Sequence, residues 1–314
     1  MRYKILEIYL NFSCNQRCLH CFNSDEFRLS HKDLEFKTVA ETLFKMRREG
    51  YNWLLILGGE PTVYPDIFKV ISLAKNLGYK RILTFSNAQK YSDELFVKRM
   101  KEAGLTDTVI SVFGHKPELH ETVTRVPGSF EKIMKAIDNL KNEQVGIMIL
   151  LVLNALNYKY FPEIVEFFLD KGIKRYMFFA LKYQGRMTYN EAIEKMAVRL
   201  SVAFSKIDEV YKIFKKRKLK FPTIEHVPPC ILPEYVRYLG NYQPKAKDSR
   251  GILLQDGKLY DVNKLYKDLI FKPTCQKCIY YSGCSGFDAE YAKVFGDDEF
   301  RPVIFSKSCK KNKR

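Results

Sequence analysis

The sequence predicts an α/β protein in which six β-α repeats form a parallel sheet, followed by a small, loop-rich C-terminal unit. Strand-like and helix-like runs alternate from residue 5 to about 181, and the apolar periodicity disappears after residue 222. Seven of the eight cysteines lie in two regions, 14–21 and 230–284. Consecutive parallel strands need right-handed crossovers, so the sheet is either open or the wall of a partial TIM-type barrel.

Six runs are predicted as strands, most of them apolar without interruption, as expected for strands buried on both faces. They are Ile5–Leu10, Trp53–Leu57, Arg81–Phe85, Thr108–Phe113, Val145–Leu153 and Lys174–Ala180. Between them, apolar residues recur at the spacing of helical faces, such as Ile67, Val70, Ile71 and Ala74, or Ile133, Ala136, Ile137 and Leu140. We expect Ser92 and Ser129 as N-caps, Pro162 in a first turn, and Gly78, Gly104 and Gly172 at helix ends.

The remainder of the chain changes character. Residues 190–218 carry helical periodicity and predict one long helix. Prolines then follow at 222, 228, 229, 233 and 244, which is typical of a loop-rich unit that a metal site holds together. We therefore divide the chain into a barrel over 1–190, a connecting helix over 191–221 and a C-terminal unit over 222–314.

The composition excludes several classes of protein. A hydrophobic content of 46% and a charged content of 28% do not fit a disordered chain. The longest apolar run, Val145–Leu153, is far short of the ~20 residues of a membrane helix, and Glu7 falls where a signal peptide needs apolar residues. We expect a soluble, cytoplasmic protein with no membrane partner. In that compartment thiols stay reduced, so the cysteines favour metal ligation over disulfides.

The net charge of +17 has two interpretations. It marks either a solvated, lysine-rich surface or a surface for an acidic partner, such as a nucleic acid, an acidic peptide or a phosphorylated small molecule. The basic runs at 215–220 and 310–314 lack interleaved aromatic residues, so we do not expect a nucleic-acid partner.

Unusual residues lie at or just after the ends of all six predicted strands. They are Cys14, Cys18 and Cys21, then Gly58–Pro61, Ser86 and Asn87, Ser111, Asn154 and Asn157, and finally Gly185 and Arg186. In a parallel barrel the carboxyl ends of the strands share one rim, where active sites are built. We therefore expect these six segments to meet at one mouth.

The first cysteine group is a C-x3-C-x2-C run on the loop after the first strand. Three closely spaced thiolates hold three irons of a [4Fe–4S] cluster and leave the fourth iron open for another ligand. The alternative is a zinc site completed by His20 or His31. His20 lies between two of the cysteines, which makes it an awkward fourth zinc ligand.

The cysteine spacing, the aromatic His20 before the third cysteine and the run Gly58-Gly-Glu-Pro61 resemble the radical S-adenosylmethionine (SAM) enzymes over about residues 3–190. The resemblance implies a partial (β/α)6 TIM-type barrel and a [4Fe–4S] cluster whose open iron binds SAM. One electron then cleaves SAM to methionine and a 5′-deoxyadenosyl radical, which abstracts a hydrogen atom from the substrate. It also implies an electron donor such as flavodoxin or ferredoxin.

The resemblance also implies residues that bind SAM. Gly58, Gly59 and Glu60 would meet the methionine ammonium, Ser111 the carboxylate or ribose, Asn154 the adenosine and His20 the adenine, with Ser86 and Asn87 beside them. The stretch 111–130 looks like the strand-four loop of peptide-modifying members. Two departures stand out: Phe113 replaces an aspartate, and Thr124 stands where those members have an arginine. Arg125 is therefore either a clamp for the SAM carboxylate or an ordinary surface arginine.

Cys275, Cys278 and Cys284 form a C-x2-C-x5-C run that resembles the core of SPASM and twitch domains, which carry auxiliary [4Fe–4S] clusters. A full SPASM domain has further cysteines where this chain has Asp288 and Val262, so we expect a truncated version with one auxiliary cluster.

The fourth ligand of that cluster is either Cys230 or Cys309, and we favour Cys230 because Cys309 lies in a basic tail. A four-cysteine zinc knuckle is the alternative for this site.

The resemblance implies an enzyme, and most members with such a C-terminal element modify a peptide or protein. The chain starts almost at its first strand, which leaves no room for an N-terminal leader-binding domain and lowers the expectation of a ribosomal-peptide substrate. The second enzymatic hypothesis is radical oxidation or rearrangement of a small, phosphorylated or nucleotide-like molecule. A non-enzymatic redox or zinc protein leaves the shared rim of Cys14, Gly58–Pro61 and Asn154 unexplained.

Overall fold

The computed structural model describes residues 4–240, 242, 250–254, 256–261 and 269–304. One nine-stranded sheet has the strand order β7-β6-β5-β4-β3-β2-β1-β8-β9. Its strands are β1 (Ile5–Asn11), β2 (Trp53–Gly58), β3 (Arg81–Ser86), β4 (Asp107–Val112), β5 (Gly146–Leu153), β6 (Tyr176–Ala180), β7 (Thr223–Glu225), β8 (Arg250–Leu253) and β9 (Leu259–Asp261). All neighbouring pairs from β7 to β8 are parallel, and β9 pairs antiparallel with β8. The prediction of a parallel-sheet α/β fold is confirmed.

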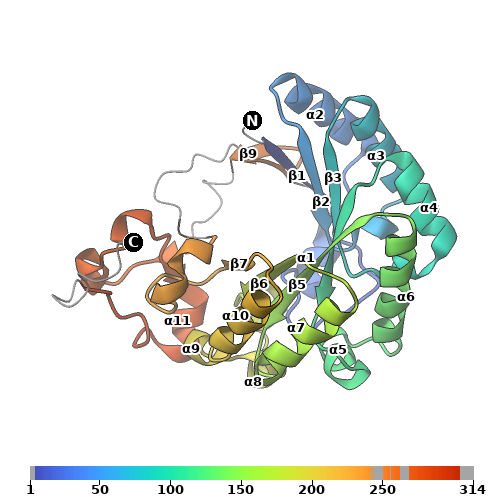
Figure 1. Cartoon of the computed structure of the whole chain (residues 1–314). Coiled ribbons are helices and arrows are strands. Elements are labelled where there is room, and N and C mark those ends of the chain that lie inside the picture. The colour runs from blue at the N-terminus through green and yellow to red at the C-terminus, as the bar shows by residue number, and fades with distance from the viewer. Residues whose placement is uncertain (1–3, 241, 243–249, 255, 262–268, 305–314) are drawn as a thin grey trace.

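The sheet curves into an open arc that does not close among the described strands, as expected of a partial barrel (Figure 1). Helices cover its outer side: α2 (Phe36–Arg48), α3 (Ile67–Asn76), α4 (Glu94–Ala103), α6 (Ser129–Asn142), α7 (Phe161–Asp170) and α10 (Ile207–Lys216). Two shorter helices, α1 (Asp25–Ser30) and α5 (Pro117–Thr124), follow β1 and β4. In the described parts of the chain, no helix combines the length and apolarity needed to cross a membrane.

The core lies between the sheet and these helices. The predicted face of α3, which consists of Ile67, Val70, Ile71 and Ala74, is fully buried, and so is the face of α6 that consists of Ile133, Ala136, Ile137 and Leu140. Gly78, Gly104 and Gly172 follow helices with positive φ angles of 83°, 126° and 83°, and Pro162 lies in the first turn of α7. These predictions are confirmed.

Both predicted serine caps are wrong. The cap of α4 is Asp93, whose Oδ1 accepts a hydrogen bond from the Phe96 N–H at 3.2 Å. Ser129 is the first residue of α6, and its hydroxyl instead pairs with that of Thr124 at 2.8 Å.

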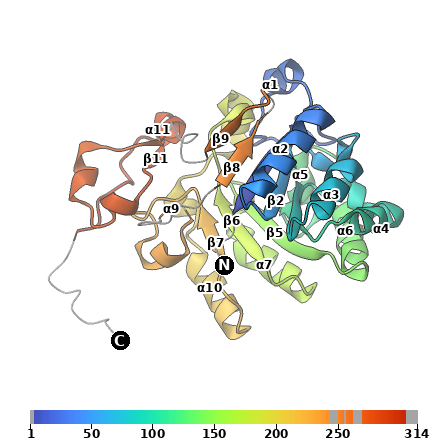
Figure 2. The same cartoon turned by 90° about the horizontal axis from the view of Figure 1, so that it is seen from above.

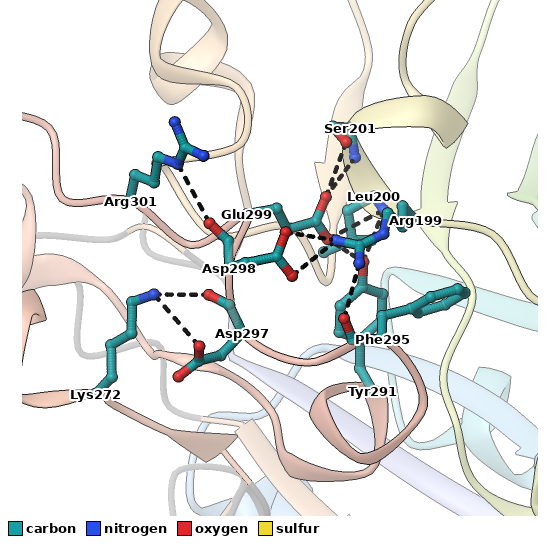
Figure 3. Close-up of polar contacts among 10 residues, drawn as sticks. All are labelled: Arg199, Leu200, Ser201, Lys272, Tyr291, Phe295, Asp297, Asp298, Glu299 and Arg301. Carbon is teal, nitrogen blue, oxygen red and sulfur yellow. Dashed lines mark hydrogen bonds and ion pairs between the residues drawn. The ribbon is translucent and has the colours of Figure 1, made fainter.

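The predicted long helix over 190–218 is also wrong, because it is broken into α8 (Asn190–Met196), α9 (Leu200–Ala203) and α10. Distant residues satisfy the backbone groups at the first break. The Val198 N–H donates to the Tyr183 hydroxyl at 3.2 Å, and the Ser201 N–H donates to the Glu299 carboxylate at 3.2 Å. Figure 3 shows Glu299 and its neighbours reaching this break from the C-terminal part of the chain.

The predicted boundary at residue 222 falls inside the large sheet. β7 extends the sheet beyond β6, whereas β8 and β9 extend it beyond β1 on the opposite edge. The remaining C-terminal elements, β10 (Leu269–Ile270), β11 (Phe287–Asp288) and α11 (Ala289–Phe295), lie away from α3 and α4, on the other side of the sheet (Figure 2). A C-terminal unit that begins at residue 222 therefore shares its first three strands with the barrel.

Candidate active site at the carboxyl ends of the strands

The loop after β1 carries the first three cysteines and rests on the C-terminal end of α5. The Arg17 N–H donates to the Thr124 carbonyl at 3.2 Å, and the Leu19 N–H donates to the Val123 carbonyl at 2.9 Å. The last carbonyls of a helix have no hydrogen-bond partner within the helix. The N–H groups of the cysteine loop supply these partners, and the same hydrogen bonds fix the path of the loop.

The thiols of this loop are partly buried and close enough to affect one another. Burial raises the pKa of Cys14 to about 11, with the Glu60 carboxylate as the next cause. Burial also raises the pKa of Cys18 strongly, and the neighbouring Cys21 and Cys14 raise it further. Thiols that resist ionisation for these reasons become thiolates when a cationic metal group binds among them. The donor set therefore fits an iron–sulfur cluster.

The glycine pair after β2 allows this loop to approach closely. Gly58 has φ 145°, and a Cβ atom there would overlap the Asn11 carbonyl oxygen; at Gly59 it would overlap the Ser13 carbonyl oxygen. The Gly59 N–H donates to the Asn11 carbonyl at 2.7 Å, and the Glu60 N–H donates to the Ser13 carbonyl at 2.9 Å. The glycines thus bring β2 against the chain's own cysteine loop, a role that the sequence pattern did not indicate.

Glu60 is fully buried and links the ends of β2 and β3. Its Oε1 accepts hydrogen bonds from the Thr62 hydroxyl at 2.6 Å and the Ser86 hydroxyl at 2.8 Å, and its Oε2 accepts from the Asn87 N–H at 2.6 Å. Burial raises the pKa of Glu60 despite these donors. The Asn87 side chain continues the network to the cysteine loop, donating to Asn15 Oδ1 at 2.7 Å and to the Cys14 thiol at 3.6 Å.

His20, between the second and third cysteines, carries a buried polar atom without a partner among the described residues. Its ring packs edge-to-face on Phe113 with 4.7 Å between ring centroids. Its Nδ1 is buried and has no hydrogen-bond partner among the described residues. Burial lowers the pKa of His20 to about 4, so the imidazole is neutral near pH 7. An orphaned ring nitrogen of this kind fits a bound ligand.

Ser111 and Asn154 lie near the carboxyl ends of two neighbouring strands, β4 and β5. Ser111 lies on β4 in register with Leu150 of β5 and is partly buried. Asn154 is fully buried just after β5, where its Oδ1 accepts from the Leu156 N–H at 3.0 Å and its Nδ2 donates to the Val152 carbonyl at 3.1 Å. The Asn154 side chain therefore shapes the turn after β5.

Arg125 follows α5 in the left-handed conformation, with φ 58°. Its guanidinium is half exposed and lies 3.9 Å from the Glu191 carboxylate of α8. The choice between a SAM clamp and a surface arginine therefore stays a prediction.

The second cysteine group gathers around one cavity in the C-terminal part of the chain. Cys230, Cys275, Cys278 and Cys284 line a space of about 370 Å³ that includes its open mouth. Burial raises the pKa of Cys230 to about 12, and the nearby thiols of Cys284 and Cys278 raise it further. The Val303 N–H donates to the Cys278 thiol at 3.4 Å. Cys309 and Val262 lie outside the described residues.

Within the described ranges, no three His, Cys, Asp or Glu side chains meet the geometry for a single metal ion. The ligand roles of both cysteine groups, and the roles of the SAM-contacting residues, stay predictions. The structure brings each cysteine group to one place in the fold: the first at the barrel mouth, the second around its own cavity.

Comparisons with known proteins agree with this arrangement. The sequence profile described as "Radical SAM superfamily" matches residues 8–168. The Fe-coproporphyrin III synthase of Methanosarcina barkeri is 25% identical over 55% of this chain and 43% of its own. The mycofactocin maturase MftC of Mycolicibacterium smegmatis is 29% identical over 42% of this chain and 33% of its own. The probable GTP 3′,8-cyclase of Thermococcus kodakarensis is 26% identical over 53% of both chains. The chain thus spans about half the length, or less, of these relatives.

Two solved structures share the fold across nearly the whole chain. Streptococcus suis SuiB, bound to the precursor peptide SuiA, superposes with a TM-score of 0.70 at 18% identity, covering 98% of this chain and 75% of SuiB. The structure of anSMEcpe with bound AdoMet and a peptide superposes with a TM-score of 0.68 at 16% identity, covering 94% of this chain and 95% of anSMEcpe. On the sequence match across half of its length, the chain belongs to the Radical SAM superfamily.

Proposed function

We propose that this chain cleaves SAM reductively to a 5′-deoxyadenosyl radical that abstracts a hydrogen atom from a bound substrate. One observation carries the proposal: the loop of Cys14, Cys18 and Cys21 is tied through Asn87 to the buried Glu60 network at the carboxyl ends of β2 and β3. A [4Fe–4S] cluster on these three thiols would supply the electron and an open iron for SAM.

The residues around that loop would support it and contact SAM. Glu60 and Asn87 hold the loop after β1 against the end of β3. This would keep the distances between the three thiols fixed. The neutral His20 ring, whose Nδ1 has no partner among the described residues, would contact a heterocycle such as adenine. Gly58 and Gly59 place their backbone where an ammonium group could also approach, and Ser111 lies on the same rim. A SAM clamp by Arg125 is less well supported, since that side chain pairs with Glu191.

We propose a second [4Fe–4S] cluster on Cys230, Cys275, Cys278 and Cys284, within a truncated SPASM- or twitch-type domain. The shared cavity of these four thiols supports this ligand set and the choice of Cys230. Burial and the neighbouring thiols raise the pKa of Cys230, so binding of a cationic group would favour its thiolate form, as at the first site. The division into a barrel over 1–190, a connecting segment over 191–221 and this domain over 222–314 belongs to the same proposal.

A peptide or protein is the substrate that we favour. Two structures that superpose on 94–98% of this chain contain bound peptides, and one curated relative is a maturase. Both structures superpose on the C-terminal region of this chain as well as on the barrel.

The second candidate is a small, phosphorylated or nucleotide-like substrate in cofactor biosynthesis. The curated relatives that are heme synthases and GTP cyclases favour it, and the net charge of +17 suits an anionic substrate. In either case an electron donor such as flavodoxin or ferredoxin would deliver the electron.

Anaerobic reconstitution tests the proposal directly. We expect about eight irons per chain and a reduced-state electron paramagnetic resonance (EPR) signal of which one component changes when SAM is added. Cys18→Ala should lose that component and 5′-deoxyadenosine formation while the circular dichroism spectrum is retained. A wild-type protein that binds no iron, or whose signal ignores SAM, contradicts the proposal.

The same assay separates the substrate classes. 5′-Deoxyadenosine formation with dithionite is compared across synthetic peptides, GTP and coproporphyrin. Stimulation by peptides alone supports the maturase-like reaction, and stimulation only by the small molecules contradicts it.

A further inference from the structure

The segment after β6 crosses the cysteine loop and contacts it through backbone and side chain. Gly185 has φ 60°, and a Cβ atom there would overlap the Phe22 carbonyl oxygen. The Arg186 N–H donates to the Cys21 carbonyl at 2.9 Å, and Arg186 Nη1 donates to the Cys18 carbonyl at 3.2 Å. Arg186 therefore donates hydrogen bonds to the backbone carbonyls of two of the three predicted cluster ligands.

Arg186 is a buried cation, with only 7% of its side chain exposed. Its Nη2 forms an ion pair with Asp25 Oδ1, just beyond the cysteine loop, whereas its Nε is buried and has no hydrogen-bond partner among the described residues. The Asp25 carboxylate is 53% exposed, so water screens its charge more than that of the guanidinium. The positive charge is therefore only partly compensated.

The ion pair is held in place from a second side. Tyr189, three residues after Arg186, donates its hydroxyl hydrogen to Glu26 Oε2 at 2.6 Å and accepts from the Asp25 N–H at 3.4 Å. The start of α1 is thus hydrogen-bonded to the segment after β6 at two residues, Arg186 and Tyr189.

A fixed cation beside metal-bound thiolates has two effects. Hydrogen bonds from outside the ligand set fix the geometry of the ligands, and their loss typically weakens metal retention about 10- to 100-fold. A positive charge also stabilises the more negative, reduced form of a cluster, which raises its reduction potential.

We propose that Arg186 is a positioning residue that fixes the Cys18–Cys21 half of the loop and raises the reduction potential of the group held there, while Asp25 limits the increase. The inference rests on the proposed function, because it takes Cys14, Cys18 and Cys21 as cluster ligands.

The test uses four full-length variants, reconstituted anaerobically. In Arg186→Gln the positive charge and the planar guanidinium donors are lost, so the midpoint potential of the SAM-responsive EPR signal should become more negative. The affinity for iron, measured by competition with a chelator, should fall roughly 10- to 100-fold. Arg186→Lys retains the charge, so its potential should stay near that of the wild type while its affinity for iron still falls. Asp25→Asn should shift the potential in the positive direction, by less than Arg186→Gln shifts it. Arg217→Gln breaks a surface ion pair with Asp170 and should change neither reading.

The opposite signs of Arg186→Gln and Asp25→Asn are decisive, because a purely structural defect moves iron retention without moving the potential in two directions. Unchanged potential and iron retention in Arg186→Gln overturn the inference and leave the proposed function intact. Wild-type protein without a SAM-responsive cluster overturns the proposed function itself. Circular dichroism of each apoprotein shows whether a variant has failed to fold.

Discussion

The carboxylate of Glu299 caps α9 by accepting the N–H of Ser201 at 3.2 Å and its hydroxyl hydrogen at 2.9 Å. The same carboxylate accepts from the Tyr291 hydroxyl, and the neighbouring Asp298 forms a two-pronged ion pair with Arg199 at 3.0 Å (Figure 3). These contacts join the C-terminal elements to the helices that follow β6.

Replacing Glu299 by glutamine should therefore weaken this junction. The amide nitrogen of glutamine is a donor and would face N–H groups that now donate hydrogen bonds to the Glu299 carboxylate. We therefore expect the free energy of unfolding to fall by about 1–2 kcal/mol. Urea unfolding followed by circular dichroism measures the change. Glu290→Gln is the matched control: its exposed pair with Lys293 on α11 should contribute less than about 0.5 kcal/mol. Equal losses in the two variants would contradict the capping role of Glu299.

Gly59→Ala tests the close approach of β2 to the cysteine loop. The new methyl group would overlap the Ser13 carbonyl oxygen, and backbone cannot move aside as a side chain can. We expect a loss of about 2–4 kcal/mol in unfolding free energy and poor iron retention after reconstitution. Gly128→Ala is the control, because a methyl group there has no atom within 4 Å and adds only the left-handed strain of about 1–2 kcal/mol. Normal iron content in Gly59→Ala would show that the loop tolerates displacement.

Asp107, at the start of β4, gives the protein a pH-dependent contribution to stability. Burial raises its pKa, but hydrogen bonds from Arg81 and Arg175 outweigh burial, and the pKa lies below its usual range. A depressed carboxyl pKa stabilises the fold above the unfolded-state value, about 3.9, and this contribution is lost as the pH falls through the lower folded-state pKa.

Asp107→Asn should thus destabilise the protein by roughly 2 kcal/mol at pH 6, a figure reduced for the partial exposure of both arginines. The difference from the wild type should shrink as the pH falls below about 4. Urea midpoints at a series of pH values measure it. A difference that stays constant down to pH 3 would exclude a role for the Asp107 charge.

Strands β1 to β6 were predictable because each is a local apolar run that can be recognised in the sequence without knowledge of its distant partners. The convergence of the polar segments followed from the rule that parallel strands share one rim, and Asn87 and Cys14 do meet there. The roles within the rim were less predictable. The buried network of Glu60 and the use of Gly59 against Ser13 depend on the spacing between loops, which no sequence pattern records.

The errors have tertiary causes. The break between α8 and α9 is stabilised by Glu299, nearly a hundred residues away, so helical periodicity alone predicted one helix. Strand β7 has three residues and follows a proline, which left no strand signal, although it pairs with β6. Arg186 shows the same limit, because only the fold reveals which carbonyl groups its guanidinium contacts.

The fourth ligand of the proposed auxiliary cluster is decided by two single variants, Cys230→Ala and Cys309→Ala. Cys230 lines the same cavity as Cys275, Cys278 and Cys284, so its removal should leave that site one thiolate short. We expect the iron content after desalting to fall from about eight toward about four per chain, with the SAM-responsive EPR signal retained. Cys309→Ala should keep about eight irons. The reverse pattern would assign the ligand to Cys309, and about four irons with one zinc in the wild type would make the C-terminal site a zinc knuckle.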